Sequence, residues 1–131
     1  MNRTVLVIED TETCAATLEV ALAEIPEVEV SLASTVREAL RILNREHPSV
    51  DAVVTDLNLP FIDGFELIRI LRADPRHARV PIVVTSADPD PGAPGRALAL
   101  GADAYFAKPY SPALVRQAVE QLLNANQCSK P

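Results

Sequence analysis

VVTDLNLP, residues 53–60, is an apolar stretch that runs directly into a carboxylate. Three β-branched residues precede Asp56, and Leu57 follows it. A run that is apolar without alternation is typical of a parallel strand that is covered on both faces. Because taking a carboxylate out of water costs free energy, Asp56 at the end of such a strand requires a partner or a function. The stretch therefore predicts a parallel sheet with a polar site at the ends of its strands.

Runs of strand length and helical segments alternate along the chain. The runs are VLVI (5–8), VEVSLA (28–33), VDAVVT (50–55), IVVT (82–85) and the weaker DAYFA (103–107). Apolar residues at the i, i+3, i+4, i+7 spacing of an amphipathic helix occur in segments 13–25, 35–46, 65–72 and 111–123. This order predicts an α/β fold in which right-handed crossovers place helices on both faces of a parallel sheet.

Sequence signals mark where three of the helices begin. Ser34 or Thr35 is the expected N-cap of the second helix, and Glu38, three residues after Thr35, suits a capping box. Asp63 is placed to cap the third helix and Ser111 the fifth. We therefore expect these helices to start directly after the named residues.

The fourth helix has an unusual start. DPDPGAPG, residues 88–95, contains three prolines and two glycines where that helix should begin. Proline removes a backbone donor and restricts the residue before it. We therefore expect a loop, and then a short helix from about residue 93 to Gly101.

Length and charge bound the domain and exclude some functions. The 131 residues fit one compact domain, for which we expect residues 1–124, with the polar residues 125–131 as a tail or the start of a linker. The net charge is −6, there is no run of Lys or Arg, and the only aromatic residues are three Phe and two Tyr. A DNA or RNA surface needs a basic patch or stacking platforms, so we expect no nucleic acid partner.

The cysteines and the N-terminus indicate the compartment. Cys14 and Cys128 are far apart and form no CxxC pair, which favours reduced thiols. The apolar run 5–8 is too short for a signal-peptide core or a membrane span. We expect a cytoplasmic protein without membrane contact.

Polar residues at the strand ends gather on one edge of the predicted sheet. Open parallel sheets bind ligands at the carboxyl ends of their strands. The residues at these ends are Glu9, Asp10, Asp56, Ser86 and Lys108. Plain structural alternatives exist, namely a helix cap for Asp10, a turn for Ser86 and a solvated strand end for Lys108. Because separate coincidences would have to share one edge, we expect a functional site there.

The grouping of the acids points to a cation and to phosphorus chemistry. Two carboxylates about 4 Å apart repel by roughly 4 kcal/mol at an effective dielectric near 20. Such a cluster holds protons or recruits a cation, and oxygen ligands with room for water suit Mg²⁺. Carboxylates are also nucleophiles that form acyl phosphates. With Lys108 to neutralise phosphoryl oxygens and Ser86 to hydrogen-bond one, the predicted chemistry is phosphorylation.

Four segments resemble one family in order and spacing: VLVIED (5–10), VVTDLNLPFIDGFELIRILR (53–72), PIVVTSA (81–87) and GADAYFAKP (101–109). Together they resemble the receiver domain of bacterial two-component response regulators, over the whole predicted domain. The resemblance implies a CheY-like fold, which is a flavodoxin-like (βα)5 doubly wound sandwich. Its five-stranded parallel sheet has the strand order 2-1-3-4-5, and residues 1–124 would be the receiver domain.

The resemblance also implies roles for the acidic residues. Asp56 matches the phosphate-accepting aspartate, Asp10 a direct ligand of Mg²⁺, and Glu9 a ligand that acts largely through water. The backbone carbonyl of Asn58 matches the position that completes the protein ligands of the ion. Mn²⁺ is an alternative ion for the same site.

Three further residues match the switch of the family. Lys108 matches the phosphate-contacting lysine, Ser86 the switch hydroxyl, and Tyr105 the switch aromatic that turns inward on activation. The bond from Lys108 to Pro109 falls where the family has a cis peptide, and X-Pro bonds adopt cis at low cost. We expect a cis bond here.

The implied phosphoryl donor is a sensor histidine kinase or a histidine phosphotransfer protein. The receiver would catalyse the transfer and the later hydrolysis itself, as a signalling domain and not as an enzyme in the usual sense. The surface of the fourth helix, the fifth strand and the fifth helix would then change and control an output domain or target protein of unknown identity. His47 and His77 lie at no strand end, so we expect both to be exposed and neither to be a donor.

Two features depart from the family pattern. The 88–95 segment replaces a more helical start of the fourth helix, which puts the usual output face in question. Asn58 and Asp88 stand two residues after the acceptor and the switch hydroxyl, where the family sets the lifetime of the phosphorylated state. A polar pair with an acid favours a short lifetime.

Three other classes of protein fit part of the pattern. Haloacid-dehalogenase-type phosphatases also place a nucleophilic Asp after a parallel strand beside Mg²⁺, but they need a second Asp where this chain has Asn58. A flavodoxin-like cofactor domain needs a phosphate loop where this chain has EDTETC (9–14). A degenerate receiver that only binds proteins would lack an acid or the lysine, and this chain has them all.

Overall fold

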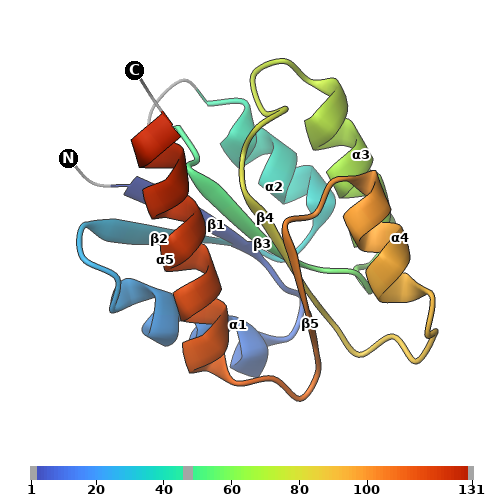
Figure 1. The fold of residues 1–131 in the computed structure, drawn as a ribbon. Coiled ribbons are helices and arrows are strands. Elements are labelled where there is room, and N and C mark those ends of the chain that lie inside the picture. Colours follow the sequence, from blue (N-terminus) through green and yellow to red (C-terminus); the bar gives the residue numbers. More distant parts are fainter. Residues whose placement is uncertain (1–2, 46–48, 130–131) are drawn as a thin grey trace.

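The structure, a computed structural model, describes residues 3–45 and 49–129. Strands and helices alternate along the described chain, as the sequence predicts (Figure 1). The elements are β1 (Arg3–Ile8), α1 (Glu12–Ala23), β2 (Val28–Ala33), α2 (Val36–Leu43), β3 (Ala52–Asp56), α3 (Gly64–Ala73), β4 (Ile82–Ser86), α4 (Ala93–Leu100), β5 (Ala104–Ala107) and α5 (Pro112–Ser129).

The strands form one parallel sheet in the order β2-β1-β3-β4-β5. Helices α1 and α5 pack on one face of this sheet, and α2, α3 and α4 pack on the other (Figure 1). This arrangement is the flavodoxin-like doubly wound sandwich. The predicted fold class and strand order are confirmed.

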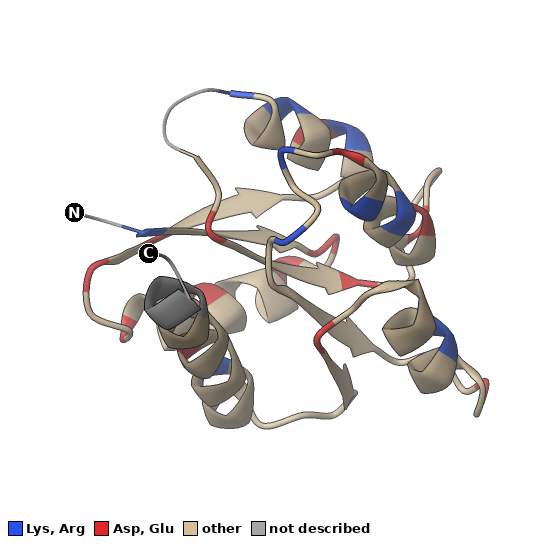
Figure 2. Ribbon diagram, turned by 45° about the horizontal axis from the view of Figure 1, so that its top comes forward, with Lys and Arg blue, Asp and Glu red and all other residues tan. Residues whose placement is uncertain are grey.

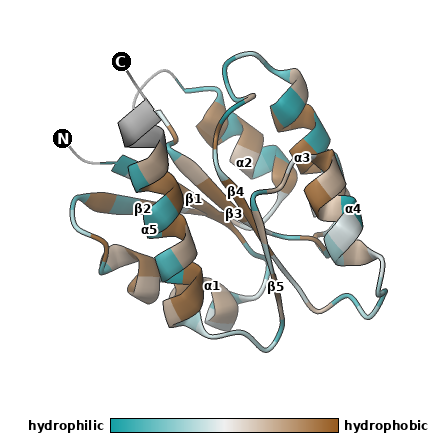
Figure 3. Ribbon diagram, viewed as in Figure 1, coloured by the Kyte–Doolittle hydropathy of each residue, from teal (hydrophilic) through white to brown (hydrophobic). Residues whose placement is uncertain are grey.

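Neighbouring residues of one strand belong to two separate cores. In β1, Leu6 and Ile8 pack with residues of α2, α3 and α4, whereas Val5 and Val7 pack with residues of α1 and α5. None of the four is more than 1% exposed. Figure 3 shows the same pattern, with hydrophobic residues along the strands and on the helix sides that face them. The apolar run of β1 is continuous because both of its faces are covered.

The helices start where the sequence signals place them. Thr35 Oγ1 accepts a hydrogen bond from Glu38 N–H at 3.1 Å, and Asp63 Oδ1 accepts one from Glu66 N–H at 3.0 Å. Ser111 directly precedes α5, and its Oγ accepts a hydrogen bond from Leu114 N–H at 3.4 Å. These contacts confirm the predicted caps, since each satisfies a backbone donor that the first helical turn leaves unpaired.

Helix α4 begins at residue 93, as the Pro/Gly-rich segment predicts, and its C-cap is Gly101. Helix α5 continues past residue 124 as far as Ser129. None of the helices in the described ranges has the length and apolarity that a membrane span needs.

The prediction that His77 is exposed is wrong. Its side chain is half-buried, and its Nε2 is buried without a hydrogen-bond partner among the described residues. The reason is a compact turn between α3 and β4, in which His77 N–H donates to Asp74 O at 2.9 Å and Val80 N–H donates to His77 O at 3.1 Å. This turn holds the ring against the protein. His47 lies outside the described residues.

Charge is distributed unevenly over the molecule. Figure 2 shows basic residues gathered on the side of α2 and α3. The sequence has no Lys or Arg from Thr4 to Val36, a stretch that includes β1 after its first residue Arg3, all of α1 and all of β2. The carboxyl end of β1 therefore contributes acids to its surroundings without a nearby basic residue in sequence.

Candidate functional site

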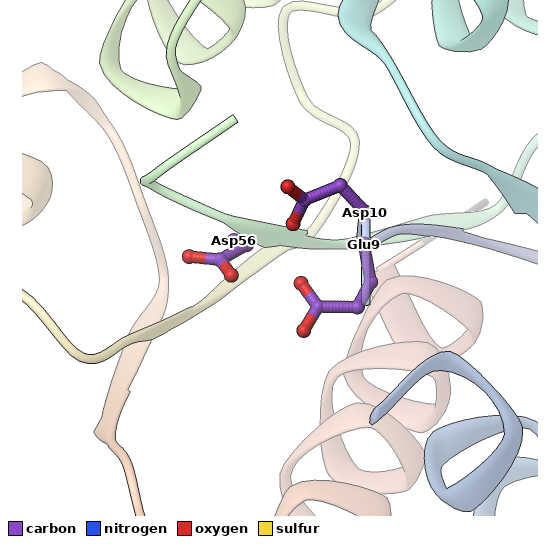
Figure 4. A group of neighbouring side chains, drawn as sticks. All are labelled: Glu9, Asp10 and Asp56. Atoms are coloured by element: carbon purple, nitrogen blue, oxygen red, sulfur yellow. The ribbon is translucent and has the colours of Figure 1, made fainter. Parts of the chain in front are cut away.

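The carboxyl ends of the parallel strands bring three acids together. Glu9 and Asp10 follow β1, and Asp56 ends β3, which lies next to β1 in the sheet. Their carboxylates face a common space (Figure 4), and one oxygen from each lies within 4.8 Å of the other two. Glu9 and Asp56 are buried, whereas Asp10 is exposed. Thr11 is the N-cap of α1, so the capping role considered for Asp10 is not the one it has.

Lys108 links two of these acids from the end of β5. Its Nζ donates hydrogen bonds to Asp56 Oδ2 at 2.8 Å and to Glu9 Oε1 at 2.9 Å. The lysine side chain is 19% exposed, so water screens these ion pairs only partly. Burial opposes its charge, but the bonds and charges of Asp56 and Glu9 outweigh burial and raise the pKa of Lys108 above its ordinary value. The lysine therefore stays cationic.

Glu9 is a buried acid that bonds to Lys108 through only one of its two carboxylate oxygens. The residue is 4% exposed, and its Oε2 has no hydrogen-bond partner in the described part of the chain. Burial and then the neighbouring Asp56 raise the pKa of Glu9 to about 7, against the opposing effect of Lys108. A buried carboxylate oxygen without a donor is a natural ligand for a cation. The three acids together fit Mg²⁺, with Mn²⁺ as the alternative.

The loop after β3 fixes the position of Asp56. Its Oδ1 accepts a hydrogen bond from Asn58 N–H at 3.0 Å, and Leu57 N–H donates to Thr85 O in β4 at 3.3 Å. Gly64, the first residue of α3, donates its N–H to Leu57 O at 2.9 Å. A Cβ at Gly64 would collide with the backbone carbonyl of Asp56. The sequence did not single out Gly64, although the Asp63-Gly64 pair is a signal from which this close approach could have been inferred.

Ser86 and Tyr105 lie beside the acids and not among them. Ser86 is 1% exposed, and its Oγ accepts a hydrogen bond from Asp88 N–H at 2.9 Å. No hydrogen bond joins it to the acids within the described residues. Tyr105 is half-buried and packs against the core on the α2–α4 side. The predicted cis bond between Lys108 and Pro109 is confirmed.

A pocket of about 490 Å³ adjoins the acidic cluster, and the sequence did not predict it. Its lining comes from the first turns of α1 and from the loop between β5 and α5: Thr13, Cys14, Thr17, Lys108, Pro109, Tyr110 and Pro112. Burial raises the pKa of the Tyr110 phenol to about 12, so the phenol stays protonated. Because Lys108 lines it, the pocket reaches the site from the α1–α5 side.

Comparison with known proteins identifies the family. Residues 5–120 match the family model described as the response regulator receiver domain. The chain belongs to this family. Receiver domains are signalling domains of two-component systems and not classical enzymes, and a phosphoacceptor role is implied by membership.

One relative of this receiver chain is PhoP of Bacillus subtilis, described as an alkaline phosphatase synthesis transcriptional regulatory protein. The two are 34% identical over 131 residues. The match includes 100% of this chain and 52% of PhoP, so the chain spans about half the length of that relative.

Solved receiver structures share the fold. A putative response regulator from Chloroflexus aurantiacus superimposes with a TM-score of 0.85 at 32% identity, covering 95% of this chain and 99% of its own. The receiver domain of a sensor histidine kinase from Pseudomonas aeruginosa PAO1 gives 0.81 at 27% identity, again with 95% and 99% covered. That domain was solved with a magnesium ion coordinated in its active-site cleft.

Proposed function

We propose that this receiver domain accepts a phosphoryl group on Asp56 from a sensor histidine kinase or a histidine phosphotransfer protein. The observation that carries the proposal is the pair of short bonds from Lys108 Nζ, at 2.8 Å to Asp56 Oδ2 and at 2.9 Å to Glu9 Oε1. These bonds hold an ammonium group against the carboxylate that would become the acyl phosphate. Membership of the receiver family supports the same role.

The residues around Asp56 supply the nucleophile, the charge and the geometry. A carboxylate oxygen of Asp56 bonds to phosphorus while the bond from phosphorus to the donor's imidazole nitrogen breaks. Lys108 remains close enough to offset the charge of the phosphoryl oxygens. The N–H of Asn58 and the close packing of Gly64 keep the carboxylate and its loop in place.

The proposed ligands of Mg²⁺ or Mn²⁺ are Asp10, Asp56 and the backbone carbonyl of Asn58, with Glu9 acting largely through water. The buried and unpaired Oε2 of Glu9 supports a cation at this edge. The magnesium ion in the Pseudomonas receiver supports the identity of the ion. When bound, the ion supplies positive charge to the phosphoryl oxygens.

The proposed output is a change in the surface formed by α4, β5 and α5. Phosphorylation adds charge and acceptor oxygens at the strand ends, Ser86 turns toward them, and Tyr105 moves into the space that opens. Because Ser86 Oγ accepts from Asp88 N–H, its hydroxyl hydrogen is available to the phosphoryl group. An output domain or target protein would bind the changed surface.

The proposed receiver domain occupies residues 1–124, and α5 continues from it to Ser129. We place the transfer reaction in the cytoplasm, as the two well-separated cysteines of the sequence favour. The receiver would also hydrolyse its own phosphoryl group. A rapid hydrolysis is expected from the polar pair at Asn58 and Asp88.

Phosphate incorporation from acetyl phosphate tests the proposal. The native chain and Asp56→Asn are each incubated with Mg²⁺ and, separately, with a chelator. Asn keeps the size of the side chain and removes the nucleophile, so label is expected only in the native chain and only with the metal. Label that persists in Asp56→Asn, or a folded native chain that takes up none, contradicts the proposal. Steady turnover of a phosphate monoester would instead favour a phosphatase.

A further inference from the structure

The loop between β4 and α4 contains three successive hydrogen bonds from backbone to side chain. Asp88 N–H donates to Ser86 Oγ, and Asp90 N–H donates to Asp88 Oδ1. Gly92 N–H then donates to Asp90 Oδ1. All three distances are 2.9 Å. We name these three bonds the turn ladder, which starts at the switch hydroxyl and ends at Gly92, the N-cap of α4.

Two prolines make the turn ladder complete. Pro89 and Pro91 have no N–H group, so the donors of this segment are those of Asp88, Asp90 and Gly92, and the ladder uses all three. Each proline also fixes its own φ and restricts the residue before it. From residue 88 to residue 92, the connection is therefore one in which each backbone donor has a side-chain acceptor.

The turn ladder runs between two buried residues, Ser86 at its start and Ala93 directly after its last residue. Ser86 is 1% exposed, and Ala93, the residue after Gly92, is 2% exposed within the core on the α2–α4 side. The exposed residues between Ser86 and Ala93 are Ala87, Pro89, Asp90, Pro91 and Gly92. Because core packing does not hold these exposed residues, the hydrogen bonds and prolines of the segment determine how Ser86 and Ala93 move together.

We propose that the turn ladder couples the orientation of Ser86 to the position of α4, with Asp88 and Asp90 as positioning residues. The inference rests on the proposed phosphorylation of Asp56. In the unphosphorylated protein, Asp88 N–H donates to Ser86 Oγ. When Ser86 turns toward the phosphoryl group, that N–H loses its acceptor, and a backbone donor left unpaired is unfavourable. Asp88 shifts in response, and Asp90 carries the shift to the start of α4.

Two glycines make the coupling measurable. Gly64 packs against the backbone of Asp56, so its amide resonance is sensitive to changes in the loop that follows Asp56. Gly95 lies in the first turn of α4, so its amide resonance is sensitive to the position of that helix. The chain has four glycines, so their amide resonances are simple to follow in ¹⁵N-labelled protein. Spectra are recorded before and after addition of acetyl phosphate with Mg²⁺. In the native chain both resonances are expected to shift.

Asp90→Ala and Asp90→Asn separate the ladder from other roles of the loop. Ala removes the acceptor of Gly92 N–H, whereas Asn keeps an Oδ1 acceptor and loses only the charge. Both variants are expected to take up phosphate on Asp56 with a native shift of Gly64. In Asp90→Ala the shift of Gly95 is expected to fall by roughly twofold or more. In Asp90→Asn it stays native, which a general loosening of the loop would not produce.

Each contrary result has its own meaning. A native Gly95 response in phosphorylated Asp90→Ala overturns the coupling. A lost Gly95 response in Asp90→Asn overturns it too, because the effect would then follow the charge and not the acceptor. A native chain that takes up no phosphate and shows no Gly64 shift refutes the phosphorylation of Asp56, and the coupling falls with it.

Discussion

Two partly buried cations at opposite ends of the sheet are held by different kinds of acceptor. At the carboxyl ends of the strands, Lys108 bonds to the carboxylates of Asp56 and Glu9. At the amino ends of β4 and β5, the guanidinium of Arg72 in α3 donates mainly to backbone carbonyls. Its acceptors, at 2.7 to 3.3 Å, are the carbonyls of His77, Ala78, Val80 and Gly101 and the carboxylate of Asp103.

The difference shows which end of the sheet can change its bonding. Backbone carbonyls do not titrate and move only with the backbone, so Arg72 ties α3 to the starts of two strands. Burial lowers the pKa of Arg72, yet arginine remains protonated in proteins. The acceptors of Lys108 are carboxylates, a class of side chain that can bind a proton, a metal ion or a phosphoryl group. One end fixes the fold, and the other end can exchange partners.

Removal of Arg72 is expected to have the largest effect. Arg72→Met leaves the backbone carbonyls that accept from Arg72 without their donor, so the free energy of unfolding should fall by about 3–5 kcal/mol. Urea unfolding measures this change. Arg69→Met is the matched control, because Arg69 lies on the same helix and its ion pair, among residues 3–45 and 49–129, is the exposed one with Glu66. The control should change by less than about 1 kcal/mol, and an equally small change in Arg72→Met would remove the distinction between the two ends.

Removal of Lys108 should affect the reaction more than the fold. Lys108→Met takes away the charge that faces Asp56, so the rate of labelling by acetyl phosphate should fall by about 10²- to 10³-fold. Arg116→Met is the control, since Arg116 lies on α5 and its contact with Glu24 is 3.9 Å long. Labelling of Lys108→Met at the native rate would show that this end, too, uses its cation for structure alone.

The pH dependence of stability tests the raised pKa of Glu9. Its pKa is raised from 4.5 to about 7 in the folded protein. Between these values the folded protein holds a proton that the unfolded chain has released, so stability of the metal-free protein should fall as pH rises through this window, by about 2–3 kcal/mol. Urea unfolding at a series of pH values without metal measures it. Glu9→Gln, which mimics the protonated acid, should flatten the curve.

Magnesium should reverse this trend. A protonated Glu9 competes with the cation, so added Mg²⁺ should stabilise the protein more at about pH 8 than at about pH 5. An equal stabilisation at both pH values, or a native curve as flat as that of Glu9→Gln, would contradict the assignment of the raised pKa to Glu9.

The smallest expected effect concerns backbone strain. Phe61, in the loop after β3, has φ of 70° and is 98% exposed, whereas the positive φ beside Arg72 belongs to Gly101. Asn tolerates this conformation better than Phe, so Phe61→Asn should raise the free energy of unfolding by up to about 1 kcal/mol. Ile62→Asn is the control, since Ile62 has no positive φ, and it should not stabilise. A destabilised Phe61→Asn would show that Phe61 makes a contact worth more than its strain.

Much of the fold could be predicted because its causes are local in sequence. The apolar runs specify covered parallel strands, Thr35 and Asp63 specify helix starts, and the prolines delay α4 to residue 93. The grouping of Glu9 and Asp56 followed from topology, because parallel strands place their carboxyl ends on one edge. Their contacts with Lys108 are consistent with that grouping.

The features that were not predicted depend on backbone atoms or on loops. The acceptors of Arg72 are mostly carbonyls, which every residue has, so no residue type announces them. The burial of His77 follows from a turn and has no periodic pattern. The sequence contains a signal of the turn ladder, because Asp and Pro alternate from residue 88 to residue 91. The same residues also fit an irregular loop. Loop geometry therefore remained open where strand and helix geometry did not.

The two cores on opposite faces of the sheet have a consequence for how this chain tolerates change. Leu6 and Val5 are neighbours in β1, yet they pack into clusters that share no helix. Substitutions in separate, non-contacting clusters have nearly additive effects on stability. The α2–α4 side and the α1–α5 side can therefore accumulate substitutions almost independently. A lineage could remodel the helix faces on one side of the sheet while the packing of the other side stays as it was.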